Sequence, residues 1–254
     1  MKIKNSAAIV SGGASGMGFA TARLLSRAGA KVAVLDLDQN RLEKVANEIN
    51  GMAIVCDVTD ANAVEEAVLH AEKAHGVARI CVNCAGIAQS RRMLEKKGPL
   101  PSDAFLKVIQ INLIGTFHLM QRAAAAMLSA EPVGPSGERG IIINTASVAA
   151  FEGQIGQIAY SASKGGVVAM TLPAAREMAQ FGIRVMAIAP GLVDTPMFDT
   201  LPPEAREALA MSVPFPKRLA DPDEYARLVL HIVRNQMLNG EVIRLDGALR
   251  MQAK

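Results

Sequence analysis

The chain has 254 residues, half of them hydrophobic, and a formal net charge of +3. A charge this small, spread along the sequence, argues against a nucleic-acid-binding protein. No apolar run reaches the roughly 18 residues of a membrane helix, and the N-terminus lacks a signal-peptide pattern. We therefore expect a cytoplasmic protein. Because no linker-like segment divides the sequence, we also expect one domain over residues 1–254.

Short apolar runs alternate with longer amphipathic segments along the whole chain. The short runs are apolar throughout, as in strands that are buried on both faces. The predicted strands are Ala7–Val10, Val32–Leu35, Ala53–Val55, Ile80–Val82, Ile141–Asn144, Val185–Ala189 and Val242–Leu245. The predicted helices are Met17–Ala28, Arg41–Ile49, Ala63–Ala74, Asp103–Leu128, Ala159–Gln180 and Asp223–Val233. This alternation predicts an α/β fold with a Rossmann-type, doubly wound parallel sheet of about seven strands and helices on both faces.

Two segments have no regular pattern and are predicted to be surface loops. The loop Ala130–Arg139 is rich in proline and glycine, and the loop Ala88–Pro101 is basic. The cations of the basic loop are Arg91, Arg92, Lys96 and Lys97.

The three cysteines, Cys56, Cys81 and Cys84, are too few and odd in number for a disulfide framework, which fits a reducing compartment. Cys81 and Cys84 form a C-x-x-C pair within an apolar run at a predicted strand end. No second ligand pair accompanies them, and the histidines are scattered. We therefore expect these cysteines to pack in the core, and we expect no metal site.

A glycine-rich turn, Ser11–Gly18, follows the first predicted strand and opens the first predicted helix. Glycine permits positive φ, and a backbone without Cβ atoms lets a phosphate come close. The helix N-terminus then offers unpaired N–H groups and the positive end of its dipole. This setting predicts binding of a dinucleotide pyrophosphate. The residues expected to contact the cofactor are Gly12, Ser15, Gly16, Met17 and Gly18.

Asp36 ends the second predicted strand, where a carboxylate can accept hydrogen bonds from the adenosine ribose. The same carboxylate would repel the 2′-phosphate of NADP. No Arg or Lys lies in the glycine turn or directly after Asp36, where Leu37 stands. The sequence therefore predicts NAD, with Leu37 beside it. A solvated charge at a strand end is the alternative interpretation of Asp36.

Tyr160 and Lys164 are about one turn apart in a predicted helix, so their side chains share a face. A cation near the cofactor ribose favours the phenolate, so Lys164 and the positive nicotinamide ring together are expected to lower the pKa of Tyr160. Tyr160 would then act as general base on an alcohol or general acid on a ketone. Both residues are also expected to contact the cofactor. Taken alone, such a pair also describes an ordinary surface contact.

Ser147 comes just after the predicted strand Ile141–Asn144, at the end where open α/β sheets bind ligands. Its hydroxyl can donate a hydrogen bond to the substrate oxygen and orient it. A serine in this place also commonly serves as a turn residue or helix cap.

With these residues assembled, the chain resembles the short-chain dehydrogenase/reductase family over nearly its whole length. The matching segments are Ser11–Gly18, Asp57–Val58, Asn83–Gly86, Asn112, Ser147, Tyr160, Lys164 and Pro190–Gly191. Ser11 stands where the family usually has threonine. The resemblance implies an NAD-dependent oxidoreductase that transfers hydride between nicotinamide and an alcohol or ketone carbon.

The resemblance also implies roles for other residues. It places Asp57 and Val58 at the adenine, and Asn83, Ala85 and Gly86 along the adenosine ribose toward the nicotinamide. It further implies that Asn112 holds a helix kink and a water that links the catalytic lysine to solvent. The residues implied to close over the nicotinamide are Pro190, Gly191, Val193 and Thr195.

Within the family, the stretches Ile142–Gln154 and Asn239–Ala248 resemble the subgroup that oxidises 3-hydroxyacyl-CoA thioesters. The long loop Ala88–Pro101 fits that subgroup too. This resemblance implies a small-molecule substrate, tolerance for hydroxysteroids, and a homotetramer. The cations of the basic loop would meet the negative charges of CoA, although an ordinary solvated loop is the alternative. Apolar residues from Pro196 to Phe215 are expected to form a lid over the acyl chain.

Three other functions compete with this interpretation. A 3-oxoacyl-carrier-protein reductase, or another alcohol or steroid dehydrogenase of the family, would carry the same catalytic residues, but Asp36 argues against an NADP-linked reductase. A Rossmann-type methyltransferase would not need Ser147, Tyr160 and Lys164 together. A non-catalytic NAD-binding scaffold would be free to lose them.

Overall fold

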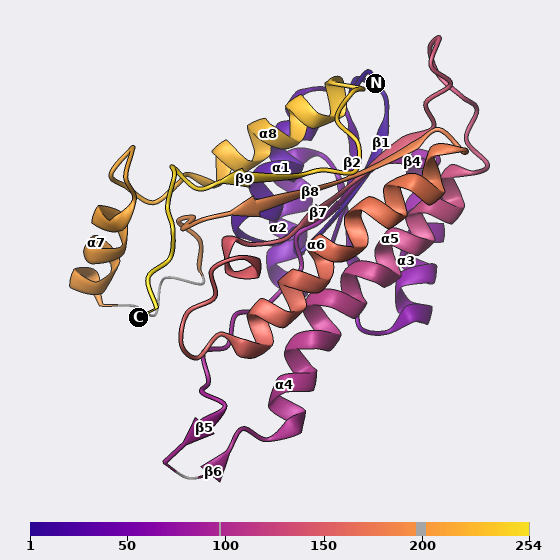
Figure 1. The fold of residues 1–254 in the computed structure, drawn as a ribbon. Coiled ribbons are helices and arrows are strands. Elements are labelled where there is room, and N and C mark those ends of the chain that lie inside the picture. Colours follow the sequence, from indigo (N-terminus) through magenta and orange to yellow (C-terminus); the bar gives the residue numbers. More distant parts are fainter. Residues whose placement is uncertain (97, 197–201, 254) are drawn as a thin grey trace.

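The computed structural model describes residues 1–96, 98–196 and 202–253, and its centre is one parallel sheet (Figure 1). The strands run in the order β3-β2-β1-β4-β7-β8-β9. Their bounds are β1 Ala7–Ser11, β2 Lys31–Asp36, β3 Met52–Val55, β4 Ala78–Asn83, β7 Gly140–Thr145, β8 Ile183–Pro190 and β9 Val242–Leu245. Every predicted strand is present, and the predicted fold class is confirmed. The strand order reverses between β1 and β4, which opens a ligand crevice at the carboxyl ends of these strands.

Helices cover both faces of the sheet (Figure 1). On one face, α1 packs against α2 and α8; on the other, α3 packs against α5, and α6 lies against β8. The helix bounds are α1 Gly16–Arg27, α2 Gln39–Ile49, α3 Ala61–His75, α4 Ser102–Ile109, α5 Gly115–Met127, α6 Ile158–Ala179, α7 Pro203–Ser212 and α8 Pro222–Arg234. Among the described residues, no helix is both long and apolar enough to cross a membrane.

Because helices cover both faces of the sheet, its strands are apolar throughout and do not alternate between polar and apolar residues. In β1, Ala8 and Val10 belong to the core beneath α1, α2 and α8, whereas Ala7 and Ile9 belong to the core beneath α3 and α5. Successive side chains of a strand point to opposite faces. Since both faces are buried, both sets of positions must be hydrophobic.

The segment Asp103–Leu128, predicted as one helix, is interrupted. A π-helical turn, Gln110–Ile114, separates α4 from α5. The hydrophobic pattern continues through this turn, so periodicity alone does not reveal it. Two tertiary contacts occur at this interruption. Within the turn, the side-chain amide of Asn112 is hydrogen-bonded to the backbone of Ile87. Directly after it, Gly115 packs so closely that a Cβ would lie 2.6 Å from Val58 Cγ2. Single π-helical turns of this kind are frequent at functional sites.

Two elements lie in segments for which no regular structure was predicted. The basic loop contains a short hairpin, β5 Leu94–Glu95 with β6 Gly98–Pro99. Helix α7 lies in the predicted lid, where proline at its first position is a usual start signal. Of the predicted lid residues, Met197, Phe198 and Leu201 lie outside the described residues. Val213 is buried with Leu192 and Leu249, so this part of the predicted lid belongs to a small core of its own.

Candidate active site

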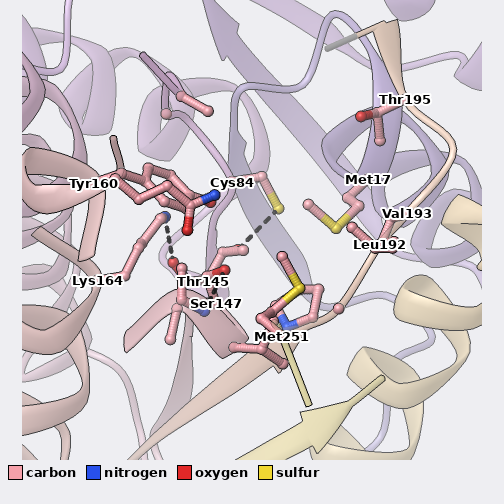
Figure 2. A pocket seen from close by; sticks show the side chains of 18 residues that line it. Met17, Cys84, Thr145, Ser147, Tyr160, Lys164, Leu192, Val193, Thr195 and Met251 are labelled. Carbon is pink, nitrogen blue, oxygen red and sulfur yellow. Dashed lines mark hydrogen bonds between the residues drawn. The ribbon is translucent and has the colours of Figure 1, made fainter. Parts of the chain in front are cut away.

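A cavity lies at the carboxyl ends of β4, β7 and β8, beside the start of α1 (Figure 2). Side chains and backbone from widely separated segments face one another across it. The predicted residues that line it are Met17, Gly86, Ser147, Tyr160, Lys164, Pro190, Gly191, Val193 and Thr195. The structure therefore brings Ser147, Tyr160 and Lys164 and the expected nicotinamide contacts into one space, whereas Asn112 does not line it.

The glycine turn between β1 and α1 depends on residues without side chains. Gly12 has a φ of +62° and Gly16 a φ of +52°. A Cβ on Gly18 would lie 2.1 Å from the Gly12 carbonyl oxygen, and a Cβ on Gly12 would lie 2.7 Å from the Ala85 nitrogen. Ser15 is the N-cap residue of α1, but no side chain caps this helix start. A glycine turn without side chains, followed by a helix N-terminus whose N–H groups are uncapped, fits the binding of a dinucleotide pyrophosphate.

Gly18→Ala is expected to destabilise the fold by about 3 kcal/mol, because the new methyl group has no room beside a backbone oxygen. Gly165→Ala is the matched control, since a Cβ there meets nothing within 4 Å. Gly165 lies in α6, where alanine should leave the free energy of unfolding unchanged or raise it by up to about 1 kcal/mol. Urea denaturation of the two variants measures the difference, and equal midpoints would contradict the steric argument.

The predicted adenosine contacts lie at the ends of β2 and β3, outside the cavity. The Asp36 carboxylate accepts hydrogen bonds from the backbone N–H groups of Ala14, at 3.1 Å, and Leu37, at 2.8 Å. These bonds fix it against the glycine turn, while the Leu37 side chain is 65% exposed. Asp57 accepts from the N–H and hydroxyl of Thr59. Val58 follows directly and is buried.

Tyr160 and Lys164 project from the first turns of α6 into the cavity (Figure 2). The Lys164 side chain is buried, and its Nζ lies 5.8 Å from the centroid of the Tyr160 ring. Nζ donates a 2.7 Å hydrogen bond to the carbonyl oxygen of Thr145. Burial lowers the pKa of Lys164 to about 8, and the nearby Cys84 thiol opposes this shift. The lysine can therefore lose its proton within the range of ordinary enzyme assays.

Ser147 stands opposite Tyr160, and its hydroxyl serves two roles. It accepts a 3.1 Å hydrogen bond from Ala149 N–H, which caps the short helical turn Val148–Ala150. It also faces the Tyr160 hydroxyl across the cavity and lowers the pKa of that group. Burial raises the pKa of Tyr160 above its ordinary value of 10, and the hydrogen bond from Ser147 opposes this rise. The expected lowering of the pKa of Tyr160 is therefore not found in the protein alone, because burial of the phenol outweighs its neighbours.

Asn112 lies beneath the cavity rather than in its wall. It is fully buried, and its Oδ1 accepts from Ile87 N–H at 2.8 Å. Its Nδ2 donates to Ile87 O at 2.9 Å and to Ser163 Oγ at 3.1 Å. These bonds tie the π-helical turn both to the segment after β4 and to α6. Asn112 thus joins the two segments that carry Gly86 and Lys164.

Asn83 and Ala85 occupy the end of β4 and the segment after it. The Asn83 side chain is buried and donates to Asn144 Oδ1 at 2.9 Å, so it points into the sheet rather than into the cavity. The backbone N–H of Ala85 donates to Ser11 Oγ at 3.3 Å, which holds this segment against the glycine turn. Any contact of Asn83 with a cofactor must therefore come from its backbone.

Comparison with known proteins decides the family. A profile of the short chain dehydrogenases matches residues 6–206. The chain belongs to the short-chain dehydrogenase family. A bovine (Bos taurus) protein named 3-hydroxyacyl-CoA dehydrogenase type-2 is 51% identical over 254 residues, which is 98% of this chain and 97% of that protein. The human (Homo sapiens) protein of that name is 50% identical with the same coverage. A crystal structure of 3-hydroxyacyl-CoA dehydrogenase type-2 from Mycobacterium avium has a TM-score of 0.94 and 40% identity and is covered to 98%, as is this chain.

These similarities confirm the resemblance drawn from the sequence. This short-chain dehydrogenase is an oxidoreductase that acts on a CH–OH group of a small molecule, in a family that uses NAD or NADP. The cavity described above is where that chemistry would take place.

Several cavity residues of this short-chain dehydrogenase escaped the sequence analysis. Cys84, expected in the core, is only half buried and lines the cavity; Thr145 and Leu192 lie beside it. Met251 reaches the cavity from the segment after β9 (Figure 2). Cys84, Thr145 and Leu192 are close in sequence to residues that were predicted to line the site, whereas Met251 carries no motif and is brought to the cavity only by the packing of the segment after β9.

The segment that carries Met251 is attached to the loop after β7. Gln154 Nε2 donates to Gln252 O, and Ile155 N–H donates to Ala253 O, both at 3.0 Å. Arg244 at the end of β9 makes a bidentate ion pair with Glu152, with distances of 2.7 and 2.8 Å. The same guanidinium binds Asp246 and the carbonyl of Leu249. These contacts make the segment after β9 one wall of the cavity.

Proposed function

We propose that this short-chain dehydrogenase uses NAD(H) to interconvert 3-hydroxyacyl-CoA and 3-oxoacyl-CoA, and that it also accepts hydroxysteroids. The observation that carries this proposal is the convergence of Ser147, Tyr160 and Lys164 in one cavity beside the bare glycine turn. The names of the bovine and human relatives support the acyl-CoA substrate. Bound nicotinamide would accept or supply the hydride.

Each catalytic side chain has a distinct task in this proposal. The Tyr160 hydroxyl takes the proton of the substrate alcohol, or gives a proton to the ketone in the reverse reaction. The Ser147 hydroxyl donates to the same substrate oxygen and orients it. The Lys164 ammonium holds the cofactor ribose and favours the Tyr160 phenolate. Asn112 acts on Lys164 indirectly, because its hydrogen bond to Ser163, the preceding residue, joins the π-helical turn to α6.

The same proposal assigns the remaining contacts. The glycine turn and the start of α1 hold the pyrophosphate, with Gly12, Ser15, Gly16, Met17 and Gly18. The adenosine lies against Asp36, Leu37, Asp57 and Val58 and against the backbone of Asn83, Ala85 and Gly86. The nicotinamide lies beneath Pro190, Gly191, Val193 and Thr195.

The substrate assignment is tested by a kinetic panel at fixed NADH. Acetoacetyl-CoA is compared with a 17-ketosteroid and with a small uncharged ketone. We expect the highest kcat/KM for acetoacetyl-CoA. A higher value for the steroid or the small ketone would overturn the acyl-CoA assignment while leaving the dehydrogenase intact.

The cofactor preference is expected to depend on Asp36. Wild type should favour NADH over NADPH, and the double change Asp36→Ser with Leu37→Arg should shift the ratio of kcat/KM toward NADPH by about tenfold or more, about 1.4 kcal/mol. The reason is that the change removes a carboxylate and adds a cation where a 2′-phosphate would lie. Glu48→Gln on the exposed side of α2 is the control for a general loss of negative charge. An unchanged ratio in the double variant would contradict the role of Asp36.

The basic loop lies beside the mouth of the cavity. Arg91 N–H donates to Gly156 O at 2.8 Å, and the next residue, Gln157, lines the cavity. The Arg91 side chain is paired with Glu95 at 2.8 Å, which compensates its charge. Arg92 and Lys96 are exposed, and neither forms an ion pair within residues 1–96, 98–196 and 202–253. Lys97 lies outside the described residues. Arg92 and Lys96 are therefore the better candidates to meet the phosphates of CoA.

Arg92→Ser with Lys96→Ser is expected to raise KM for acetoacetyl-CoA about two- to fivefold at low salt and to leave KM for a small uncharged ketone unchanged. The effect should shrink above about 0.5 M salt, since exposed charges are then screened. Arg91→Ser with Glu95→Ser, which removes an ion pair without changing the net charge, is the matched control. If KM rose equally for both substrates, the basic loop would have no specific role in binding CoA.

We also propose that the active form is a cytoplasmic homotetramer of a chain that folds as one domain over residues 1–254. Exposed apolar side chains on α4, α5 and α6 support self-association: Leu106, Phe117 and Leu172. Light scattering at micromolar concentration tests the assembly, and a monomeric mass would exclude it.

A further inference from the structure

Helix α8 carries a tyrosine whose hydroxyl contacts Thr145, the residue that also holds Lys164, although α8 covers the opposite face of the sheet from α6 (Figure 1). Tyr225 is fully buried among the hydrophobic residues beneath α1, α2 and α8. Its hydroxyl lies 2.7 Å from Thr145 Oγ1, and it accepts a longer bond from Cys84 Sγ at 3.7 Å. A buried phenol hydroxyl is tolerated when such partners are present.

The direction of the bond between Tyr225 and Thr145 follows from the number of available protons. Thr145 Oγ1 donates a 2.5 Å hydrogen bond to Asn83 O. A threonine hydroxyl has a single proton, so Oγ1 must accept from Tyr225. The bonds therefore run from the Tyr225 hydroxyl to Thr145 and on to the backbone of Asn83. The conformation of Thr145 is thus fixed from the α8 side of the sheet.

Thr145 is also the residue that holds Lys164. Its carbonyl oxygen accepts the 2.7 Å hydrogen bond from Lys164 Nζ, and no other hydrogen bond of this ammonium occurs among the described residues. The dashed line from Lys164 in Figure 2 marks this contact, with Cys84 on the other side of Thr145. The groups that face the ammonium are Thr145 from β7, Cys84 from the segment after β4, and Tyr160 from α6.

We propose that Tyr225 is a positioning residue for the reaction: by donating to Thr145, it fixes the carbonyl group that holds the Lys164 ammonium in the cavity. The inference rests on the proposed function, because it requires Lys164 to assist Tyr160. Tyr225 itself does not line the cavity. Burial raises its pKa well above 10, so it stays a neutral donor over the working pH range.

A double-mutant cycle tests the inference. Tyr225→Phe keeps the ring and removes the hydroxyl; Thr145→Val removes the acceptor. Each is expected to lower kcat about fivefold, which corresponds to about 1 kcal/mol. The double variant should be no slower than either single variant, because both changes break the same connection. Thr145→Ser keeps the hydroxyl and is the conservative rescue: it should recover most of the turnover lost in Thr145→Val. Thr171→Val is the matched control, since that buried hydroxyl on α6 bonds only the Val167 carbonyl.

The pH dependence supplies a readout that a merely structural role would not change. A carbonyl that accepts from an ammonium favours its protonated form. If Tyr225→Phe weakens that bond, Lys164 loses its proton at lower pH, and the alkaline limb of the kcat profile shifts to lower pH. The Thr171→Val profile should match that of wild type. Rates are expressed per NADH-binding site, so a misfolded fraction does not imitate the effect.

Tyrosinate absorbance gives a readout that needs no turnover. The chain has two tyrosines and no tryptophan. In the cofactor-free Tyr225→Phe variant the signal comes from Tyr160 alone, and in wild type Tyr160 ionises first because the pKa of Tyr225 is raised further. Lys164, with a pKa of about 8, is already neutral where Tyr160 ionises, so we expect the same Tyr160 ionisation in the variant and in wild type, which checks that the cavity is intact in the variant.

The outcomes separate the two levels of inference. Additive losses in the double variant, or an unchanged alkaline limb of the kcat profile in Tyr225→Phe, would overturn the positioning role alone. Normal turnover in Tyr160→Phe would instead overturn the proposed function.

Discussion

Tyr160→Phe is expected to bind NADH almost as tightly as wild type and to turn over about a thousandfold more slowly, within the range for loss of a general acid or base. The ring remains, so the cavity keeps its shape. The hydroxyl that faces Ser147 across the cavity and would exchange the substrate proton is gone. NADH binding is measured by fluorescence titration, and turnover by the absorbance of NADH with acetoacetyl-CoA.

The neighbouring residue supplies the control for Tyr160. Ser161 follows it on α6, does not line the cavity, and has a buried hydroxyl with no hydrogen-bond partner among the described residues. Ser161→Ala should therefore keep nearly wild-type kcat. If Tyr160→Phe and Ser161→Ala had similar kcat values, Tyr160 would not be the acid and base.

Lys164→Met is expected to lose nearly all turnover, to weaken cofactor binding, and at the same time to stabilise the fold at pH 7. The pKa of Lys164 is lowered from 10.5 to about 8 by burial. Between these two pH values the unfolded chain binds more protons than the folded chain, so the free energy of unfolding rises with pH across that window. Below it the lysine is charged in both states, and the full cost of burial, about 3 kcal/mol, is present.

Methionine has a similar length and no charge to bury, so the variant should recover part of that cost. Thermal unfolding at pH 7 measures the gain, and wild-type stability measured at pH 8 and pH 10 checks the linkage. Lys44→Met on the exposed side of α2 is the control and should leave the unfolding temperature nearly unchanged. A lower unfolding temperature for Lys164→Met than for wild type at pH 7 would contradict this account.

The sheet was predictable because each of its strands depends on local sequence and on cover from both sides. Val32 to Leu35 are all buried, so their unbroken hydrophobicity reports the strand directly. The π-helical turn at Gln110–Ile114 was not predictable in this way, because it changes the helical repeat without changing the residue types. Its position follows from the bonds of Asn112 to Ile87 and Ser163, which exist only in the folded chain.

The residues of the candidate site also fall into those that local sequence could predict and those that it could not. Tyr160 and Lys164 are one turn apart, and the glycine turn is continuous in sequence, so local geometry suffices to predict each of them. Tyr225 and Met251 reach the site from α8 and from the segment after β9, and nothing in their own neighbourhood marks them. Only the packing of the whole sheet brings Tyr225 to Thr145 and Met251 into the wall of the cavity.

The wall formed by the segment after β9 differs in construction from the rest of the cavity. The catalytic side is built on β7 and α6, whereas Met251 is held by two backbone acceptors and a group of ion pairs around Arg244. A change in this segment alters the space open to a substrate without disturbing the tyrosine, the lysine or the glycine turn. In enzymes with this architecture, a few substitutions in the segment after the last strand can therefore change the range of substrates. The residues that transfer the proton can stay the same.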